Sequence, residues 1–280
     1  MNENMNPLQS HFRRPAIYLT LPSKGEFWPE NALELTATGE IPVLPMTTKD
    51  EITIRTPDAL LNGHGVTEVI QSCIPNIKNA WEMPSIDVDA ALIAIRIASY
   101  SDQMEVDTKC PACDEDNEYN VNLHNILGSI HTPDYSTPLV VDGLSFKFRP
   151  QKYSEVNKMN LVNFEEQKVL RTINDASLED TEKSEQFAQH LSRLIDLNNR
   201  VYVDSLESIT ILGPETKVIS NSVYINEYIK NADRKVINQI REKIESFGAA
   251  VKIKSVPVTC GHCSHPFNVE ITFDYANFFA

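Results

Sequence analysis

Long runs of apolar residues are missing from this 280-residue sequence. No stretch comes near the roughly eighteen consecutive apolar residues that a membrane-spanning helix requires. The polar start, Met1–Arg14, also has no apolar block of the kind that a secretory signal peptide carries. We therefore expect no membrane span, and we expect the protein to stay in the compartment in which it is made.

Basic residues are scarce as well. The chain has 25 lysines and arginines against 39 aspartates and glutamates, which gives a formal net charge of −14 at pH 7. The first hundred residues and the remainder are both acidic, so the total does not conceal a basic domain. Because nucleic-acid binders gain much of their affinity by neutralising phosphates, this balance argues against broad nucleic-acid binding.

Common catalytic motifs are absent too. The sequence has no GxxxxGKS/T phosphate loop, no GxGxxG turn, no HExxH and no GxSxG. His64 stands between two glycines, where a histidine is more often a solvated turn residue than a general base. The acidic pairs Glu165–Glu166 and Glu179–Asp180 are typical of solvated helix faces and loops. We predict that the protein is not an enzyme.

The sequence does contain five cysteines, which are too few for a disulfide scaffold in a chain of this length. Four of them form two CxxC pairs. A CxxC pair with proline or glycine inside makes a tight turn that directs two sulfur atoms at one point, and two such turns supply a tetrahedral zinc site. We predict that one Zn²⁺ ion is bound by Cys110, Cys113, Cys260 and Cys263. Since four protein ligands leave no position for water, this zinc would be structural and not catalytic.

Both pairs are flanked by residues that alternate between apolar or aromatic and polar, which is the period of a β-strand. The residues that alternate with polar ones are Met104, Val106, Thr108, Tyr119, Val121 and Leu123 around the first pair, and Val256, Val258, Phe267, Val269, Ile271 and Phe273 around the second. We therefore expect each pair at the tip of a β-hairpin, and the two knuckles together as a zinc ribbon. The halves of this ribbon are 147 positions apart, from Cys113 to Cys260.

Two other interpretations of the pairs stay open, namely a thioredoxin-like redox pair and plain buried thiols. A redox CxxC begins a helix, whereas strands are expected after both pairs here. His262 and His265 could each replace a thiolate, but with four cysteines present we expect both histidines outside the ligand set. Cys73 lies on an apolar helical face and is expected to be a small buried hydrophobe.

The chain as a whole indicates an α+β protein, with a small N-terminal α/β region, the ribbon, and a mostly helical insertion between the two halves of the ribbon. We expect a mobile tail at 1–15, an N-terminal α+β region at 16–102, a split zinc ribbon at 103–127 plus 251–280, and a mainly helical insertion with one β-hairpin at 128–250.

Local patterns predict individual elements within these parts. Strands are expected near Tyr18, at Ile41–Leu44 and at Ile52–Ile54, and a hairpin is expected to turn at Asp142–Gly143. Helices are expected from Thr56–Asp58 with a break at the glycines before Val66–Cys73, at Ala90–Ala98 (buried on most sides), at Ser154–Ile173, at Glu182–Leu197, and from Asp233 to a stop at Gly248, with an exposed linker at Asn174–Lys183.

Four sequence blocks follow one another in a notable order. They are Leu21–Gly25 (LPSKG) with Phe27–Trp28, then Pro45–Glu51 (PMTTKDE), then Ala91–Tyr100 (ALIAIRIASY), then Cys110–Cys113 (CPAC). Together they resemble the T4-type base plate proteins of contractile-tailed bacteriophages, a family that includes a small hub subunit and a hub assembly factor. The resemblance covers residues 16–127 and, more loosely, the helices and the second cysteine pair near the C-terminal end.

This resemblance implies a non-enzymatic structural or assembly component of the base plate, in its hub region, that acts through contacts with other phage tail or hub proteins. The protein would be assembled in the host cytoplasm and end in the virion, with no small-molecule substrate and no nucleic-acid partner. Two alternatives stay open: a metalloenzyme, which would need an open coordination position at its zinc ion, and a zinc-ribbon nucleic-acid or transcription-associated module. Such a module needs basic and aromatic hairpin tips, whereas Asp114, Glu115 and Asp116 follow the first cysteine pair.

Overall fold

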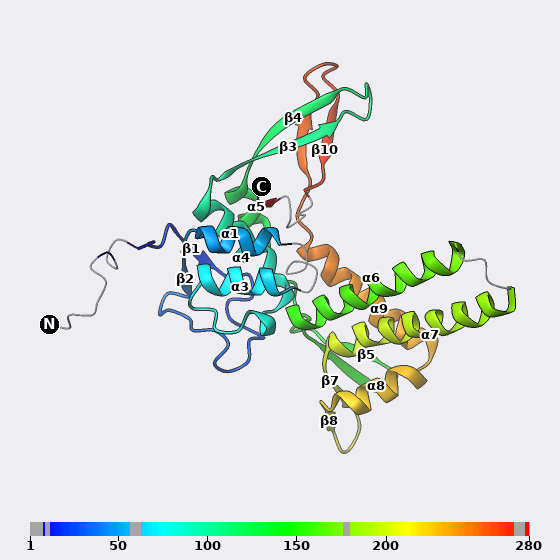
Figure 1. Cartoon of the computed structure of the whole chain (residues 1–280). Coiled ribbons are helices and arrows are strands. Elements are labelled where there is room, and N and C mark those ends of the chain that lie inside the picture. Colours follow the sequence, from blue (N-terminus) through cyan, green and yellow to red (C-terminus); the bar gives the residue numbers. More distant parts are fainter. Residues whose placement is uncertain (1–7, 9–11, 57–62, 176–179, 272–277, 280) are drawn as a thin grey trace. The chain divides into compact units, whose positions relative to one another are not determined.

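The computed structural model describes residues 8, 12–56, 63–175, 180–271 and 278–279, and for 170–175, 180–189 and 191 it describes the backbone alone. The predicted α+β class is confirmed, because helices and small sheets are both present (Figure 1). The chain forms two compact units. Unit 1 consists of 1–80, 87–131 and 253–280, and unit 2 consists of 81–86 and 132–252. The four-part division expected from sequence stays a prediction.

Unit 1 is built from short strands and helices. In chain order they are β1 (Ile17–Thr20), β2 (Glu40–Val43), α1 (Thr48–Arg55), α3 (His64–Cys73), α4 (Ser85–Ser99), β3 (Gln103–Lys109), β4 (Asp116–Asn122), α5 (Leu123–Ser129), β9 (Val256–Thr259) and β10 (Pro266–Val269). The strands form three antiparallel two-stranded sheets, β1–β2, β3–β4 and β9–β10. The last two sheets are the hairpins that carry the cysteine pairs.

Helix α4 is buried on nearly all sides, as its apolar sequence predicts. Every residue from Ala90 to Ile95 is at most 1 % exposed.

Cys73, at the end of α3, is fully buried, which confirms its predicted place in the core. Burial raises the pKa of its thiol to about 12, and the nearby charge of Asp50 adds to the rise.

The LPSKG turn is fixed to α4 by a buried carboxylate. Asp87 accepts hydrogen bonds from the Ser23 N–H at 2.8 Å, the Ser23 hydroxyl at 2.5 Å and the Trp28 Nε1–H at 2.9 Å. Gly25 in this turn has φ of +86°, and a Cβ there would stand 2.4 Å from Leu35 Cδ1. Ser23 and Gly25 are therefore required in this turn for separate reasons, Ser23 for its hydrogen bonds to Asp87 and Gly25 for its positive φ and its lack of a Cβ atom.

Asp87 should make the stability of unit 1 depend on pH. Burial raises the pKa of Asp87 to about 6, although three hydrogen bonds oppose the rise. Because the folded state binds this proton more tightly than the unfolded state, stability is lost as the pH rises from about 4 to about 6. Relative to the Asp87→Asn variant, we expect the wild-type free energy of unfolding to fall by about 1.3 kcal/mol between pH 5 and pH 7 in urea titrations followed by tryptophan fluorescence.

Asp50→Asn is the matched control for this titration. Burial raises the pKa of Asp50, but hydrogen bonds from Thr47 and Ser72 and the Arg13 charge lower it overall. Its contribution to stability is therefore lost only as the pH falls below the ordinary range of an aspartate, and it should not change between pH 5 and pH 7. Parallel pH curves for wild type and Asp87→Asn would contradict the assignment.

The strand expected at Ile52–Ile54 is wrong, because these residues belong to helix α1. A capping box starts this helix: the Asp50 N–H donates to Thr47 Oγ1 at 3.3 Å, and the Thr47 N–H donates to Asp50 Oδ2 at 2.8 Å. Two free amides are satisfied in this way, so a short apolar stretch with strand propensity becomes helical. The predicted helix start at Thr56–Asp58 falls mostly in 57–62, outside the described residues.

Part of the segment expected as a mobile tail is bound to the rest of unit 1. The Arg13 guanidinium donates to the carbonyls of Pro45 at 2.9 Å and Ser72 at 2.6 Å, and it pairs with Asp50 at 3.1 Å. Residues 1–7 and 9–11 of that segment lie outside the described residues.

Unit 2 combines a four-stranded antiparallel sheet with helices. Its elements are β5 (Leu139–Val141), β6 (Leu144–Phe148), α6 (Tyr153–Asp175), α7 (Asp180–Asp204), β7 (Leu206–Ile211), β8 (Lys217–Ile219), α8 (Ser222–Asn231) and α9 (Arg234–Val251), with a short 3₁₀ turn, η2 (Ala80–Glu82), at the boundary of the units. The strand order is β5-β6-β7-β8. Aromatic contacts connect α8 and α9 to the sheet: Phe146 with Tyr228 at 6.1 Å and Phe148 with Phe247 at 5.6 Å between ring centroids.

The hairpin and the three helices predicted within unit 2 are present, with some of their ends displaced. The hairpin at Asp142–Gly143 is confirmed, with positive φ at both residues as a tight primed turn requires. Helices α6 and α7 are confirmed, and so is the helix predicted to begin near Asp233, because α9 starts at Arg234 with Asp233 as its N-cap. The stop at Gly248 is wrong, because α9 continues to Val251. The linker expected at 174–183 is wrong where it is described, because 174–175 end α6 and 180–183 begin α7, and 176–179 lie outside the described residues. None of the described helices combines the length and the apolar character that a membrane crossing needs.

Candidate metal centre

The two cysteine pairs lie in hairpin turns with the same backbone structure. In each turn the first cysteine donates its N–H to the carbonyl five positions later, at 3.0 Å for Cys110 and 2.9 Å for Cys260. The carbonyl of the same cysteine accepts the N–H from four positions later, at 2.9 Å and 3.0 Å. The residue at that fourth position, Asp114 or Ser264, has a positive φ of 62° or 58°. Two segments far apart in sequence thus fold into equivalent knuckles.

Backbone amides in both knuckles point at sulfur. The N–H groups of Ala112 and His262 each lie 3.4 Å from the Sγ atom of the cysteine two positions earlier, Cys110 or Cys260. Such amides stabilise a thiolate more than a neutral thiol. The two turns therefore place backbone N–H groups beside sulfur atoms that could bind a metal ion.

The four sulfur atoms form one compact group. All of them lie within 4.8 Å of one another, and Cys110 Sγ is 3.7 Å from Cys263 Sγ, as is Cys113 Sγ from Cys260 Sγ. A tetrahedron of sulfur atoms around zinc, with Zn–S distances of about 2.3 Å, has edges of about 3.8 Å. The same separations are far too long for a disulfide bond, which is about 2.05 Å. The donor set and its spacing therefore fit a tetrahedral metal ion.

Burial and ionisation differ among the four cysteines. Cys110 and Cys260 are buried, Cys113 is half-buried and Cys263 is exposed. The N–H groups of Cys263 and His262 lower the pKa of Cys260 to about 6 against the effect of burial. The N–H of Glu115 lowers the pKa of Cys113, but burial and the three neighbouring thiols outweigh it and raise that pKa to about 12. Four thiols this close lose their protons together only when a cation balances their charge.

Direct hydrogen bonds also join the two hairpins beside the cluster. The Tyr119 hydroxyl on β4 donates to the Thr259 carbonyl on β9 at 3.0 Å, and the Gly261 N–H donates to Asn117 Oδ1 at 2.9 Å. Tyr119 also packs edge-on against Phe267, with ring centroids 6.1 Å apart. The sequence pattern placed Tyr119 only in an expected strand and indicated no role for Asn117, because nothing local to either residue points to a partner about 140 positions away.

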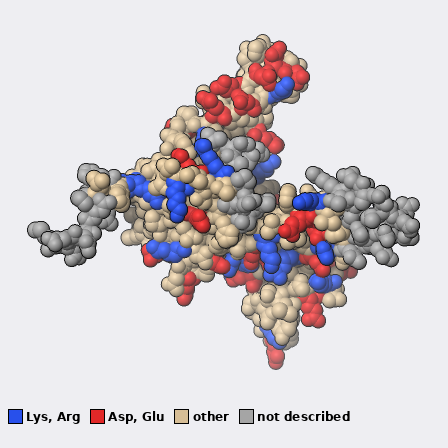
Figure 2. All heavy atoms as spheres, viewed as in Figure 1, with Lys and Arg blue, Asp and Glu red and all other residues tan. Residues whose placement is uncertain are grey.

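The residues around the cluster argue against histidine ligands, a redox pair and a nucleic-acid-binding tip. His262 and His265 are exposed and are not among the four grouped residues. Strands and not helices follow both pairs, which disfavours a thioredoxin-like arrangement. The tip after the first pair carries the exposed acids Asp114, Glu115 and Asp116, and acidic side chains crowd this part of the surface (Figure 2). That charge is unfavourable for phosphate.

Comparison with known proteins gives one match. A family model described as T4 bacteriophage base plate protein matches residues 15–280, which is nearly the whole chain. No curated protein and no solved structure matches.

Proposed function

The chain belongs to the T4 bacteriophage base plate protein family, and on that premise we propose that it is a non-enzymatic structural or assembly component of the hub region of the base plate. Membership in the family implies a place in the phage tail and interaction with other tail proteins. Within that role, the chain would be assembled in the host cytoplasm and act only through protein–protein contacts.

We further propose that Cys110, Cys113, Cys260 and Cys263 hold one structural Zn²⁺ ion and that the hairpins β3–β4 and β9–β10 form a zinc ribbon. The observation that carries this proposal is the grouping of four sulfur atoms within 4.8 Å, from pairs 147 positions apart. Four thiolates fill the coordination sphere, so the ion would bind no water or substrate. An ion of this kind would stabilise the fold of the two hairpins and take no part in a reaction.

The zinc would cross-link two segments between which all of unit 2 except 81–86 lies. A cross-link over so long a loop restricts the unfolded chain, and it couples metal binding to folding. A rigid, chemically inert part of this kind suits an assembly that must hold a defined shape while it docks other proteins.

Infection by phage that cannot make this chain tests the proposed function. We expect base plates and complete tails to be missing from lysates examined by electron microscopy, with few infectious particles, and we expect the wild-type chain supplied in trans to restore them. Mass spectrometry of purified particles then distinguishes a structural component, which is present, from an assembly factor, which is not. A normal yield of infectious particles without the chain would refute the proposal.

A further inference from the structure

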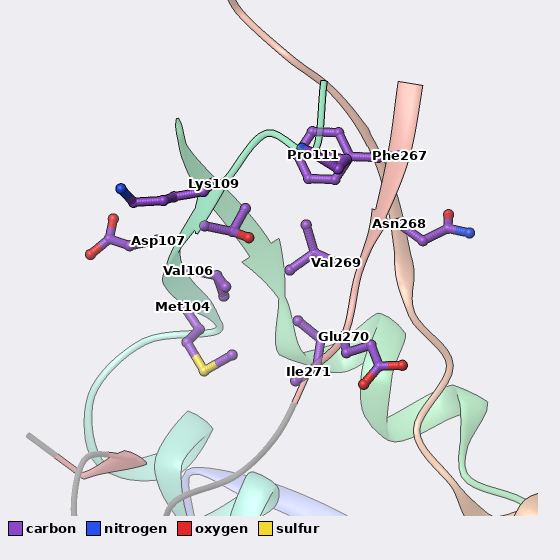
Figure 3. A pocket seen from close by; sticks show the side chains of 11 residues that line it. Met104, Val106, Asp107, Lys109, Pro111, Phe267, Asn268, Val269, Glu270 and Ile271 are labelled. Carbon is purple, nitrogen blue, oxygen red and sulfur yellow. The ribbon is translucent and has the colours of Figure 1, made fainter. Parts of the chain in front are cut away.

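An open groove of about 440 Å³ lies between strands β3 and β10 of unit 1 (Figure 3). Four apolar side chains point into it, those of Met104 and Val106 on β3 and of Val269 and Ile271 on the segment that begins with β10, while most of the surface that lines it is polar. Asp107, Lys109 and Asn268 point away from it (Figure 3). The alternation of side chains that buries one face of each hairpin thus also gives this groove an apolar floor.

The groove lies between the two strands that the hydrogen bonds between the hairpins do not join. Hydrogen bonds connect β4 and its turn to β9 and its turn, as described for Tyr119 and Asn117. On the other side, within the described part of the chain, β3 pairs with β4 alone and β10 with β9 alone. Two strand edges therefore face each other without pairing.

The lining residues indicate that backbone edges form the walls. The groove is lined by three consecutive residues, Asp107–Lys109, on one side and by five, Phe267–Ile271, on the other. Because successive side chains of a strand point to opposite faces, a run of consecutive residues can line one groove only through its backbone edge. An exposed edge presents N–H and C=O groups that pair readily with an added strand.

Charge limits what kind of strand would bind. The hairpin from Gln103 to Asn122 has six acidic residues, Glu105, Asp107, Asp114, Glu115, Asp116 and Glu118. Its one basic residue is Lys109, whose Nζ atom lies 3.9 Å from Oδ1 of Asp116. Glu270 adds a further acidic residue on the opposite wall of the groove. An occupant with basic side chains on its outer face would be attracted, and an acidic one would be repelled.

We propose that the groove between β3 and β10 binds an extended, basic segment of a partner tail protein as an added β-strand. Apolar side chains of that segment would enter the groove, and the alternate, basic side chains would face the acidic rim. This proposal deepens the proposed role in protein–protein contact and rests on it, because it names the kind of partner segment that the hairpins accept.

A synthetic peptide in which valine and lysine alternate is the probe for this groove. Added to the intact, metal-containing protein, it should shift the amide NMR signals of β3 and β10 and slow hydrogen exchange at their outer edges. The same peptide with glutamate in place of lysine should not bind. Thr108→Arg, which introduces a bulky positive side chain into the groove, should weaken binding of the lysine peptide at least about tenfold.

Glu40→Gln is the matched control, because it changes the net charge by the same amount at an exposed position on β2, outside both the acidic hairpin and the lining of the groove. It should alter binding of the lysine peptide by no more than about twofold. No binding at millimolar peptide, perturbations elsewhere, or equal binding of the glutamate peptide would each overturn the proposal. If hydrogen exchange at the edges of β3 and β10 slowed as the protein concentration rose without peptide, the occupant would be a second copy of this chain, and the proposal would be overturned. If the chain proved essential for base plates but did not bind the peptide, the proposal for the groove would be refuted and the proposed function would stand.

Discussion

Replacement of Cys110 by serine should release the bound metal and separate the two hairpins of unit 1. A structural zinc site contributes an apparent binding free energy of about 10–16 kcal/mol, which becomes folding free energy where the site does not exist in the unfolded chain. In a chain-entropy treatment, the cross-link over 147 positions by itself accounts for about 5 kcal/mol. We expect the purified variant to have no bound zinc and to lose the native melting transition of unit 1 in calorimetry.

Cys73→Ala is the control for this substitution. It removes a thiol from the buried end of α3 and leaves all four sulfur atoms of the cluster in place. This variant should keep one metal ion per chain and melt only slightly below the wild type. If Cys110→Ser kept both its zinc and the wild-type transition, the cluster would not be holding the hairpins together.

The second large effect is expected from Phe279→Ala. Phe279 is completely buried, packs edge-on against Phe278 with ring centroids 5.0 Å apart, and its carbonyl accepts a hydrogen bond from Arg55 Nη2 at 2.9 Å. Truncation of a buried phenylalanine costs about 3–5 kcal/mol, because apolar contacts are lost and a cavity remains. We expect the melting temperature of unit 1 to fall by roughly 10 °C in calorimetry, with the metal content unchanged.

Phe164→Ala removes the same ring from an exposed position on α6, where the side chain is 53 % exposed. It should change the melting temperature by no more than about 2 °C. If both variants melted alike, the C-terminal phenylalanines would not be part of the core of unit 1. If Phe279→Ala also lost the metal, the C-terminal segment and the cysteine cluster would be one cooperative element.

The features that sequence reasoning predicted best are local ones. The alternation around each CxxC pair predicted β3–β4 and β9–β10, and the continuous apolar stretch predicted the burial of α4. In each case the signal lies within about twenty residues and follows from one periodicity. The sulfur atoms of all four predicted ligands come together, while their binding of zinc stays a prediction.

The features that sequence reasoning missed depend on contacts between distant residues. Ser23 and Asp87 are 64 positions apart, and Arg96 donates to the Phe278 carbonyl 182 positions away. Strands β7 and β8 were not predicted, although they extend the predicted hairpin into a four-stranded sheet. A single hydrogen bond or strand pairing across such distances leaves no periodic trace in sequence, so only the folded structure identifies the partners.

The error at Ile52–Ile54 has a different cause. Three residues of apolar and β-branched character predict a strand when taken alone. The capping box of Thr47 and Asp50 is also local, and it lies in the block PMTTKDE. Here a capping signal outweighed propensity, and a search for threonine followed three positions later by an acid would have found it.

Metal analysis of the purified chain, combined with X-ray absorption at the zinc edge, tests the central claim most directly. We expect one zinc ion per chain with four sulfur neighbours at about 2.3 Å and no oxygen ligand. Protein that folds without any bound metal, or a zinc ion with three sulfur neighbours and an open position, would contradict the account of an inert cross-link.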